Sequence, residues 1–210
     1  MDFTIIVTVG PGLLEKNKIK KIDSLGNCIF RINGAHADGE QTRNITNTIR
    51  GFSPDAKIMI DLPGNKVRTK NLTEPLRLSK GEELILQEYQ VNYTNFYQHL
   101  KAGDTIYAND SIFTHEVVKI VGNTVQLLSH SDGLLQTNKG LHVQGIHAEI
   151  PFLFERDQEL IDVACEIDLD VISLSFVRTA DDIKVVKNIL KEKNNTSTEL
   201  FAKIETAAAL

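Results

Sequence analysis

The sequence predicts an α/β fold whose parallel sheet is interrupted by an inserted all-β domain. Short apolar runs alternate with amphipathic stretches over residues 1–67 and again over residues 150–210, which is the pattern of strand–helix units on a parallel sheet. Residues 68–149 instead contain short strand-like runs separated by turns such as 102–104, which is typical of a small all-β domain.

Three strands and two helices are expected before the insertion. Residues 4–9, 28–32 and 58–60 are short apolar runs, which indicate buried strands. Between them, apolar residues recur at helical spacing over 13–25, and 38–51 is a second helical stretch. Short connections between buried strands predict βαβ units.

Two further strand–helix units are expected after the insertion. The predicted helices cover residues 154–167 and 181–193, and the predicted strands cover 171–176 and 200–204. Within the insertion we expect short strands at 76–78, 83–86, 105–107, 116–121 and 124–128.

Composition excludes several functional classes. The formal net charge is −5, which argues against a general binder of nucleic acids or membrane surfaces. No run approaches the roughly 20 apolar residues of a membrane span, and the first ten residues lack the basic region of a signal peptide. Cys28 and Cys165 sit in apolar surroundings and predict buried free thiols, so we expect a protein of the reducing cytoplasm.

Polar side chains follow the predicted strands, where parallel α/β proteins build their active sites. Arginines and lysines beside carboxylates suit a polyanionic substrate held together with a divalent cation. The residues in or just after the strand ends are Arg31, Asn33, Asp61, Lys66, Arg68, Ser175, Arg178, Lys203 and Glu205.

Each of these positions has an alternative interpretation. Arg31 lies inside an apolar strand, so it either faces a site or is paired, because an unpaired buried charge is costly. Asp61 could instead cap the following turn. Lys203 and Glu205 alternate with apolar residues and would face solvent on an antiparallel edge strand, but the mouth of a barrel on a parallel one.

Other common catalytic signals are missing. The sequence contains no glycine-rich phosphate loop, no CxxC pair and no nucleophile elbow. Four histidines of the insertion, His115, His130, His142 and His147, do not have metal-ligand spacing.

Seven segments together resemble the pyruvate kinase family. They match the family in order and cover essentially the whole chain: TIIVTVGP, IFRINGAH, MIDLPGNKVRT, IYANDSI, NKGLHVQG, DVISLSFVR and FAKIE. The family resemblance implies a (β/α)8 TIM-type barrel with a small all-β lid inserted after strand three. It also implies phosphoryl transfer between phosphoenolpyruvate and ADP, yielding pyruvate and ATP, with Mg²⁺ (or Mn²⁺) as cofactor.

The resemblance assigns roles by position. Lys203 and Arg31 would be catalytic, with Lys203 stabilising the charge of the transferring phosphoryl group, and Glu205 would bind the divalent metal. The residues implied to bind phosphate or nucleotide are Arg31, Asn33, His36, Arg68 and Asp110. Ser175 is a candidate for the substrate pocket, and Asn33 and Asp61 match the monovalent-cation site.

Departures from the family pattern concern the monovalent cation and the lid. Ala35 replaces a serine, and Lys66 stands where K⁺-dependent members have glutamate, so the chain resembles members that need no K⁺. Leu62, Pro63 and Gln144 also depart from the pattern, as does the lid sequence Asn109-Asp110-Ser111.

Five strands make an incomplete barrel, and its two outer strands would be open edges with apolar faces exposed. The chain would therefore be an N-terminal fragment, a section completed by other chains, or a section tolerated through oligomerisation. As partners we expect a complementing chain or a homo-oligomer. One hypothesis is a phosphotransferase whose site is completed by residues outside this chain. The alternative is a catalytically inactive binding or assembly subunit. An aldolase or lyase in the same barrel is a third possibility, which the β lid argues against.

Overall fold

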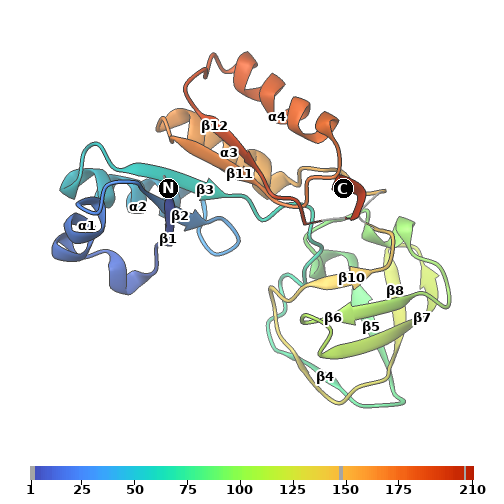
Figure 1. The fold of residues 1–210 in the computed structure, drawn as a ribbon. Helices are drawn as coiled ribbons and strands as arrows, with labels where there is room; N and C mark the ends of the chain where they lie inside the picture. Colours follow the sequence, from blue (N-terminus) through green and yellow to red (C-terminus); the bar gives the residue numbers. More distant parts are fainter. Residues whose placement is uncertain (1–2, 147–148, 206) are drawn as a thin grey trace. The chain divides into compact units, whose positions relative to one another are not determined.

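The structure is a computed structural model that describes residues 3–146, 149–205 and 207–210 (Figure 1). It divides into two compact units. The α/β unit contains the residues up to Gly64 and from Phe152 onward, and the all-β unit runs from Asn65 to Pro151. Lys66 therefore belongs to the all-β unit.

The α/β unit is built on one parallel sheet. Within the described residues, its strands are β1 (Ile5–Thr8), β2 (Cys28–Asn33), β3 (Lys57–Asp61), β11 (Val171–Leu174) and β12 (Glu199–Ala202). They pair in the order β1-β2-β3-β11-β12, and every pair is parallel. The predicted α/β class, with five strands of a partial barrel and an inserted β unit, is confirmed.

Two of the helices in the α/β unit, α2 and α4, begin at residues whose side chains cap them. The helical elements are η1 (Pro11–Leu13), α1 (Lys16–Asp23), α2 (Gly39–Phe52), α3 (Glu155–Glu166), α4 (Ala180–Glu192) and η5 (Ala207–Ala209). The Asp38 carboxylate accepts the Gln41 N–H at 2.7 Å and the Gln41 side chain accepts the Asp38 N–H at 2.9 Å, which forms a capping box for α2. α1 is shorter than predicted because Glu15 is in an extended conformation.

The two faces of the sheet have different chemistry because side chains alternate along each strand. One face packs against the helices in the main core, which includes Phe30 and Ile60 from the strands. The other face has a small apolar cluster of Ile29, Met59 and Val171, with Phe201 packed against it. Arg31, Asp61 and Lys203 each come two residues after a member of this apolar cluster, so their side chains lie on the same second face, nearer the strand ends.

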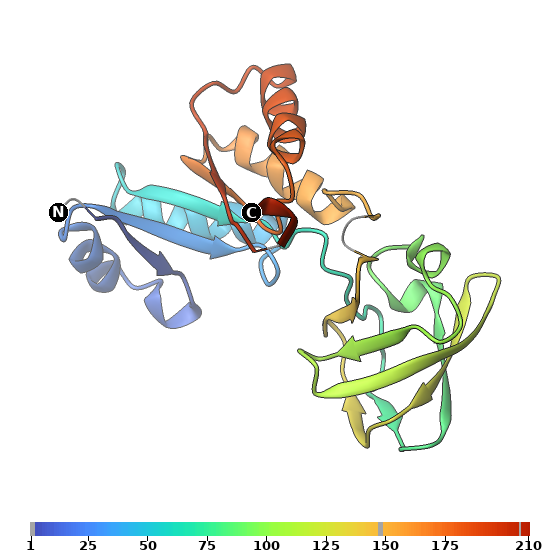
Figure 2. The same ribbon diagram turned by 45° about the vertical axis from the view of Figure 1, so that its right-hand side comes forward.

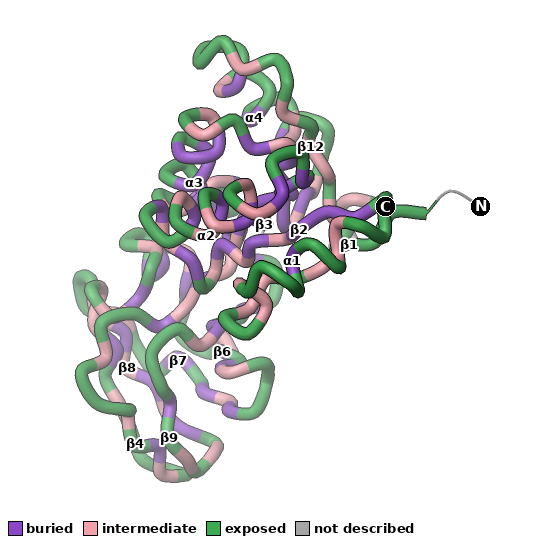
Figure 3. Tube along the Cα trace, turned by 90° about the vertical axis from the view of Figure 1, so that its left-hand side faces the viewer, coloured by how far each residue is buried: buried purple, intermediate pink, exposed green. Residues whose placement is uncertain are grey.

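Strand β1 is an exception to the predicted burial. It was predicted to be buried, but Ile5 and Ile6 are 39% and 46% exposed (Figure 3). The reason is its position at the sheet edge, where β2 is its partner among the described strands. This agrees with the expectation that the outer strands of the section present apolar surface.

The all-β unit is built from antiparallel pairs (Figure 2). Its elements are β4 (Leu76–Leu78), β5 (Glu83–Gln87), η2 (Glu88–Gln90), η3 (Phe96–His99), β6 (Thr105–Ala108), β7 (Phe113–Val121), β8 (Thr124–Ser129), β9 (Gly133–Leu135) and β10 (Leu141–Val143). β10-β6-β7-β8-β5 form one sheet, and β4 pairs with β9. Sequence patterns missed β9 and β10 because each has only three residues and depends on a distant partner strand.

A buried histidine lies in the core of the all-β unit. His115 of β7 is 1% exposed, and neither ring nitrogen has a hydrogen-bond partner within the part of the chain that the structure describes. Burial lowers the pKa of His115 to about 4, and the charge of His130 acts in the same direction. His115 is therefore neutral at physiological pH and packs as an aromatic ring.

This histidine should make the all-β unit sensitive to acid. Between about pH 6.5 and pH 4 the unfolded chain binds the proton before the folded one, so the free energy of unfolding should fall by about 3 kcal/mol on acidification through this range. His115→Phe should remove this part of the pH dependence in urea unfolding followed by circular dichroism. His142→Gln, at an exposed position of β10, serves as the control, and an unchanged pH slope in His115→Phe would contradict the explanation.

Two smaller expectations have structural outcomes. Both cysteines are free thiols, with Cys28 buried and Cys165 partly exposed. Among the described residues, none of the helices has both the length and the apolar character needed to cross a membrane. His147 lies outside the described residues.

Candidate functional site

Asp61 is the centre of a charged cluster in the α/β unit. It ends β3 and is 5% exposed. Its Oδ2 accepts two hydrogen bonds from Arg31, from Nε at 2.9 Å and from Nη2 at 2.6 Å. Its other oxygen, Oδ1, lies 2.9 Å from Nζ of Lys203 in an ion pair that lacks hydrogen-bond geometry. The Asp61 carboxylate thus holds two cations. Arg31 comes from the neighbouring strand β2, and Lys203 comes directly after β12.

Arg31 reaches Asp61 because both side chains project from the same face of neighbouring strands. Its third contact is from Nη1 to Oγ1 of Thr8, at 2.7 Å. Thr8 ends β1 and was missed by sequence reasoning, although it is a polar residue at a strand end and so had the same signal as the others. The structure shows that Arg31 both faces the site and is paired, which had been separate interpretations.

Lys203 and Glu205 follow the fifth strand directly. β12 ends at Ala202, and the Lys203 N–H continues its ladder by donating to the Leu174 carbonyl at 3.0 Å. Lys203 Nζ lies 3.7 Å from Oε1 of Glu205, while the other oxygen of Glu205 accepts the Phe176 N–H at 3.1 Å. The cluster therefore contains two cations and two carboxylates.

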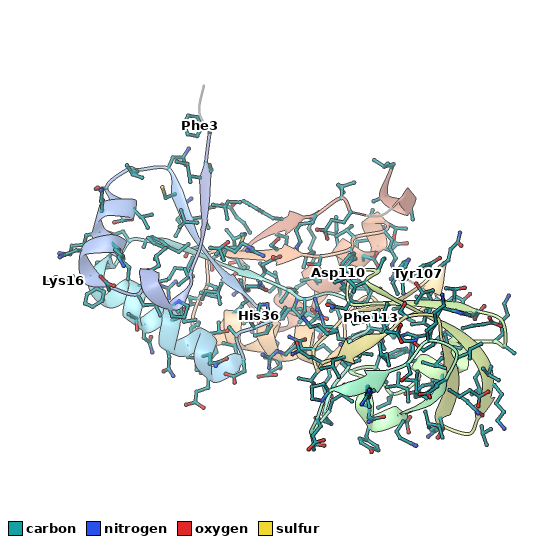
Figure 4. The ribbon with its side chains drawn as sticks, turned by 90° about the horizontal axis from the view of Figure 1, so that it is seen from below. Phe3, Lys16, His36, Tyr107, Asp110 and Phe113 are labelled. Carbon is teal, nitrogen blue, oxygen red and sulfur yellow. The ribbon has the colours of Figure 1, made fainter. Side chains whose placement is uncertain are left out.

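The remaining predicted residues of the α/β unit do not join this cluster. Asn33 Oδ1 accepts the Ala35 N–H at 3.1 Å, and Ser175 is buried with its hydroxyl donating to the Leu62 carbonyl at 2.5 Å. His36, labelled in Figure 4, is exposed. The roles assigned to Asn33, Ser175 and His36 stay predictions.

Arg178, which also follows a strand, has a structural partner. Its guanidinium forms an ion pair with Asp182 of α4 at 2.8 Å, and its charged group lies 5.8 Å from the centre of the Phe152 ring. Asp182 also accepts the Arg178 N–H at 2.9 Å. These contacts fix the start of α4.

A second charged cluster lies within the all-β unit. Lys66 Nζ donates to Oδ1 of Asp110 at 3.0 Å, and Arg68 Nη1 donates to the Asn138 carbonyl at 3.2 Å. The hydrogen bond and charge of Lys66 lower the pKa of Asp110, and Arg68 and Lys139 act in the same direction. Burial lowers the pKa of Arg68. Lys139 was not among the predicted site residues.

Asp110 is displayed on an unusual turn, and Figure 4 labels it. Asn109, Asp110 and Ser111 have φ values of 52°, 53° and 69°, the left-handed conformation that costs non-glycine residues energy. Asn and Asp adopt this conformation more readily than other non-glycine residues, and the binding role assigned to Asp110 stays a prediction. The structure pairs the Lys66 side chain with Asp110. This contact does not test the predicted role of Lys66 as a substitute for K⁺, which stays a prediction.

The charged cluster of the α/β unit could hold a divalent metal ion only if substrate or water supplied further ligands. Within the described ranges, no three His, Cys, Asp or Glu side chains gather closely enough to bind a metal ion. Mg²⁺, however, is commonly bound through one or two carboxylates together with substrate oxygens and water. Glu205 fits that arrangement, because among the described residues its Oε1 has a long ion pair with Lys203, at 3.7 Å, and no hydrogen bond.

Comparison with known proteins identifies the family. The family model "Pyruvate kinase, barrel domain" matches residues 2–210. The chain is 31% identical to the pyruvate kinase of Thermococcus litoralis over 222 residues, covering 98% of this chain and 46% of the relative. It is 27% identical to that of Borreliella burgdorferi over 209 residues, covering 96% of this chain and 44% of the relative.

A parallel α/β section with an inserted antiparallel β unit is the architecture of a partial α/β barrel that carries an inserted domain. The chain belongs to the pyruvate kinase family. It spans less than half the length of these curated relatives.

Proposed function

We propose that this chain takes part in phosphoryl transfer between phosphoenolpyruvate and ADP, in a Mg²⁺-dependent site completed by residues outside these 210. The observation that supports this most directly is the Arg31–Asp61–Lys203 cluster with Glu205 beside it. Phosphoryl transfer needs positioned cations more than covalent chemistry, and this cluster offers an arginine and a lysine within reach of one carboxylate.

Each residue of the cluster has a distinct proposed task. Arg31 presents a planar guanidinium suited to phosphoryl oxygens, and Lys203 supplies a point charge against the charge of the transferring group. Asp61 keeps both cations in place before substrate arrives, at the same edge of the sheet. A magnesium ion bound by Glu205 and the substrate would supply further charge neutralisation.

The balance of charges predicts cooperation between metal and substrate. Two cations and two carboxylates leave the cluster without a net charge for a phosphate dianion, so a divalent cation should strengthen substrate binding. K⁺ is not required in this proposal, because Arg31 and Lys203 already neutralise Asp61.

The cluster at Lys66, Arg68 and Asp110 is proposed to contact phosphate or nucleotide. We further propose that this chain works with a complementing chain or with a second copy of itself, and that it is located in the cytoplasm.

A binding experiment tests this function. Calorimetric titration of the chain with phosphoenolpyruvate and Mg²⁺, in a buffer free of K⁺, should show binding that Lys203→Ala weakens at least about tenfold, because one direct charge-assisted contact is lost. Lys184→Ala serves as the matched control, since Lys184 forms an exposed pair with Asp181 on α4. No binding by the unmodified chain, or equal loss in both variants, would refute the proposed site.

One observation favours the second candidate, a non-catalytic binding or assembly subunit. The turn Asn109-Asp110-Ser111 departs from the family pattern in the inserted unit, which is proposed to contact phosphate or nucleotide. Retained phosphoenolpyruvate binding, without pyruvate formation from ADP in any native complex containing this chain, would support this candidate. We expect little turnover by the isolated chain.

A further inference from the structure

A buried carboxylate lies beneath the turn that follows Asp61. Asp157, the third residue of α3, is 0% exposed. Its Oδ1 accepts the Gly64 N–H at 2.8 Å and its Oδ2 accepts the Phe154 N–H at 2.9 Å. Gly64 is the last residue of the α/β unit before the insertion, and Phe154 follows its return to this unit. Asp157 thus holds together, by hydrogen bonds, the segment that leaves the α/β unit at Gly64 and the segment that has returned to it at Phe154.

The Gly64 turn connects Asp157 to the candidate site. Gly64 has a φ of 69°, and a β-carbon there would lie 2.8 Å from the Ser175 side chain and 2.9 Å from the Phe176 ring. The turn therefore packs directly on the end of β11. From that point the Phe176 N–H donates to Glu205, the candidate metal ligand. A continuous set of contacts leads from Asp157 through Gly64 and Phe176 to Glu205.

The charge on Asp157 is unfavourable for stability. Burial raises its pKa to about 6, against the opposing effects of its two backbone hydrogen bonds and of Arg156, the charged residue that acts on it. Between the unfolded value of 3.8 and about 6, the folded state binds the proton more tightly. The contribution of this group to stability is therefore largest at low pH and falls as the pH rises through this window. If Asp157 served stability alone, an uncharged residue at this position would be more favourable than a buried carboxylate.

We propose that Asp157 is a positioning residue: its carboxylate fixes the Gly64 turn and, through Phe176, orients Glu205 at the metal–phosphate end of the site. The inference rests on the proposed function, since it concerns the same site. Groups that orient a metal ligand from behind commonly change metal affinity by about 10–100-fold when they are replaced.

The variant Asp157→Asn separates positioning from stability. Its amide oxygen can accept one N–H, but its NH₂ group faces the other backbone donor. Phosphoenolpyruvate binding at pH 7.5 with Mg²⁺ should weaken about tenfold. The unfolding midpoint at this pH should change little, because removal of a buried charge offsets the cost of the backbone N–H that is left without an acceptor. Asp162→Asn, at an exposed position of the same helix, should leave phosphoenolpyruvate binding unchanged and alter the unfolding midpoint only slightly.

The pH dependence of stability is the second readout. The unmodified chain should gain stability relative to Asp157→Asn as the pH falls from about 6 to about 4. Because other titrating groups are common to both proteins, the difference between them isolates Asp157. A difference that does not vary with pH would overturn the assignment.

The outcomes distinguish this inference from the proposed function. Loss of both stability and binding in Asp157→Asn would indicate a purely structural residue, and unchanged affinity would show that the turn does not orient the site; either result overturns the inference. If Lys203→Ala weakens binding and Asp157→Asn does not, the proposed function survives without it. If the unmodified chain does not bind phosphoenolpyruvate, both fail.

Discussion

Asp61→Asn should lower the free energy of unfolding of the α/β unit by about 2 kcal/mol at low ionic strength. The Asp61 side chain is only 6% exposed, and it neutralises Arg31 and Lys203, whose side chains are 27% and 32% exposed. Removing its charge leaves two partly buried cations with one neutral amide, and hydrogen bonds to charged groups are worth about 1.5–3 kcal/mol. Partial exposure of the two cations keeps the loss toward the lower part of that range.

An added anion should reverse this loss. Sulfate can occupy the place of the missing charge between Arg31 and Lys203, so it should raise the thermal midpoint of Asp61→Asn more than that of the unmodified chain. Circular dichroism melts across a sulfate series, with chloride at equal ionic strength, provide the measurement. Asp162→Asn breaks an exposed pair with Lys193 and should change stability by less than about 1 kcal/mol. Equal sulfate responses in all three proteins would contradict the role of Asp61 as the counter-ion.

Gly64→Ala should lower the free energy of unfolding of the α/β unit by about 3 kcal/mol. The left-handed conformation at φ 69° costs an alanine about 1–2 kcal/mol. The new β-carbon would also lie 2.8 Å from Cβ of Ser175, and overpacking costs typically about 1–3 kcal/mol. The end of β11 must move to accommodate it, so phosphoenolpyruvate binding should weaken as well.

A second glycine of the α/β unit separates the two causes. Gly26 has a φ of 84°, but nothing lies within 4 Å of a β-carbon placed there. Gly26→Ala should therefore lose only the conformational part, about 1 kcal/mol, in urea unfolding. If both variants lose the same free energy, then packing of Gly64 against β11 does not contribute.

Much of the fold could be read from local patterns. The apolar run of β2, interrupted by Arg31, indicated a buried strand with one charged side chain on a distinct face. The helix predicted over 38–51 matches α2, and the capping box that begins it needs only the neighbouring residues Asp38 and Gln41. The short strands β9 and β10 had no such local signal, because their hydrogen bonds all come from segments distant in the chain.

The candidate site was only partly predictable for the same reason. A polar residue at a strand end suggests a site, but not its partner: Arg178 carried that signal and pairs with Asp182 of the next helix. Asp157 carried no site signal, because Gly64, whose N–H it accepts, is 93 positions away.

The sequence by itself determined the order of strands and helices, the inserted β unit and the resemblance to the pyruvate kinases, since these depend on periodicity and short motifs within continuous segments. Only the tertiary structure decided that Asp61 holds Arg31 and Lys203 at once, that Lys66 pairs with Asp110, and that Asp157 lies beneath the Gly64 turn. The physical reason is that charges and hydrogen-bonding groups act over a few ångströms of space, and sheet order brings together residues that are far apart in the chain.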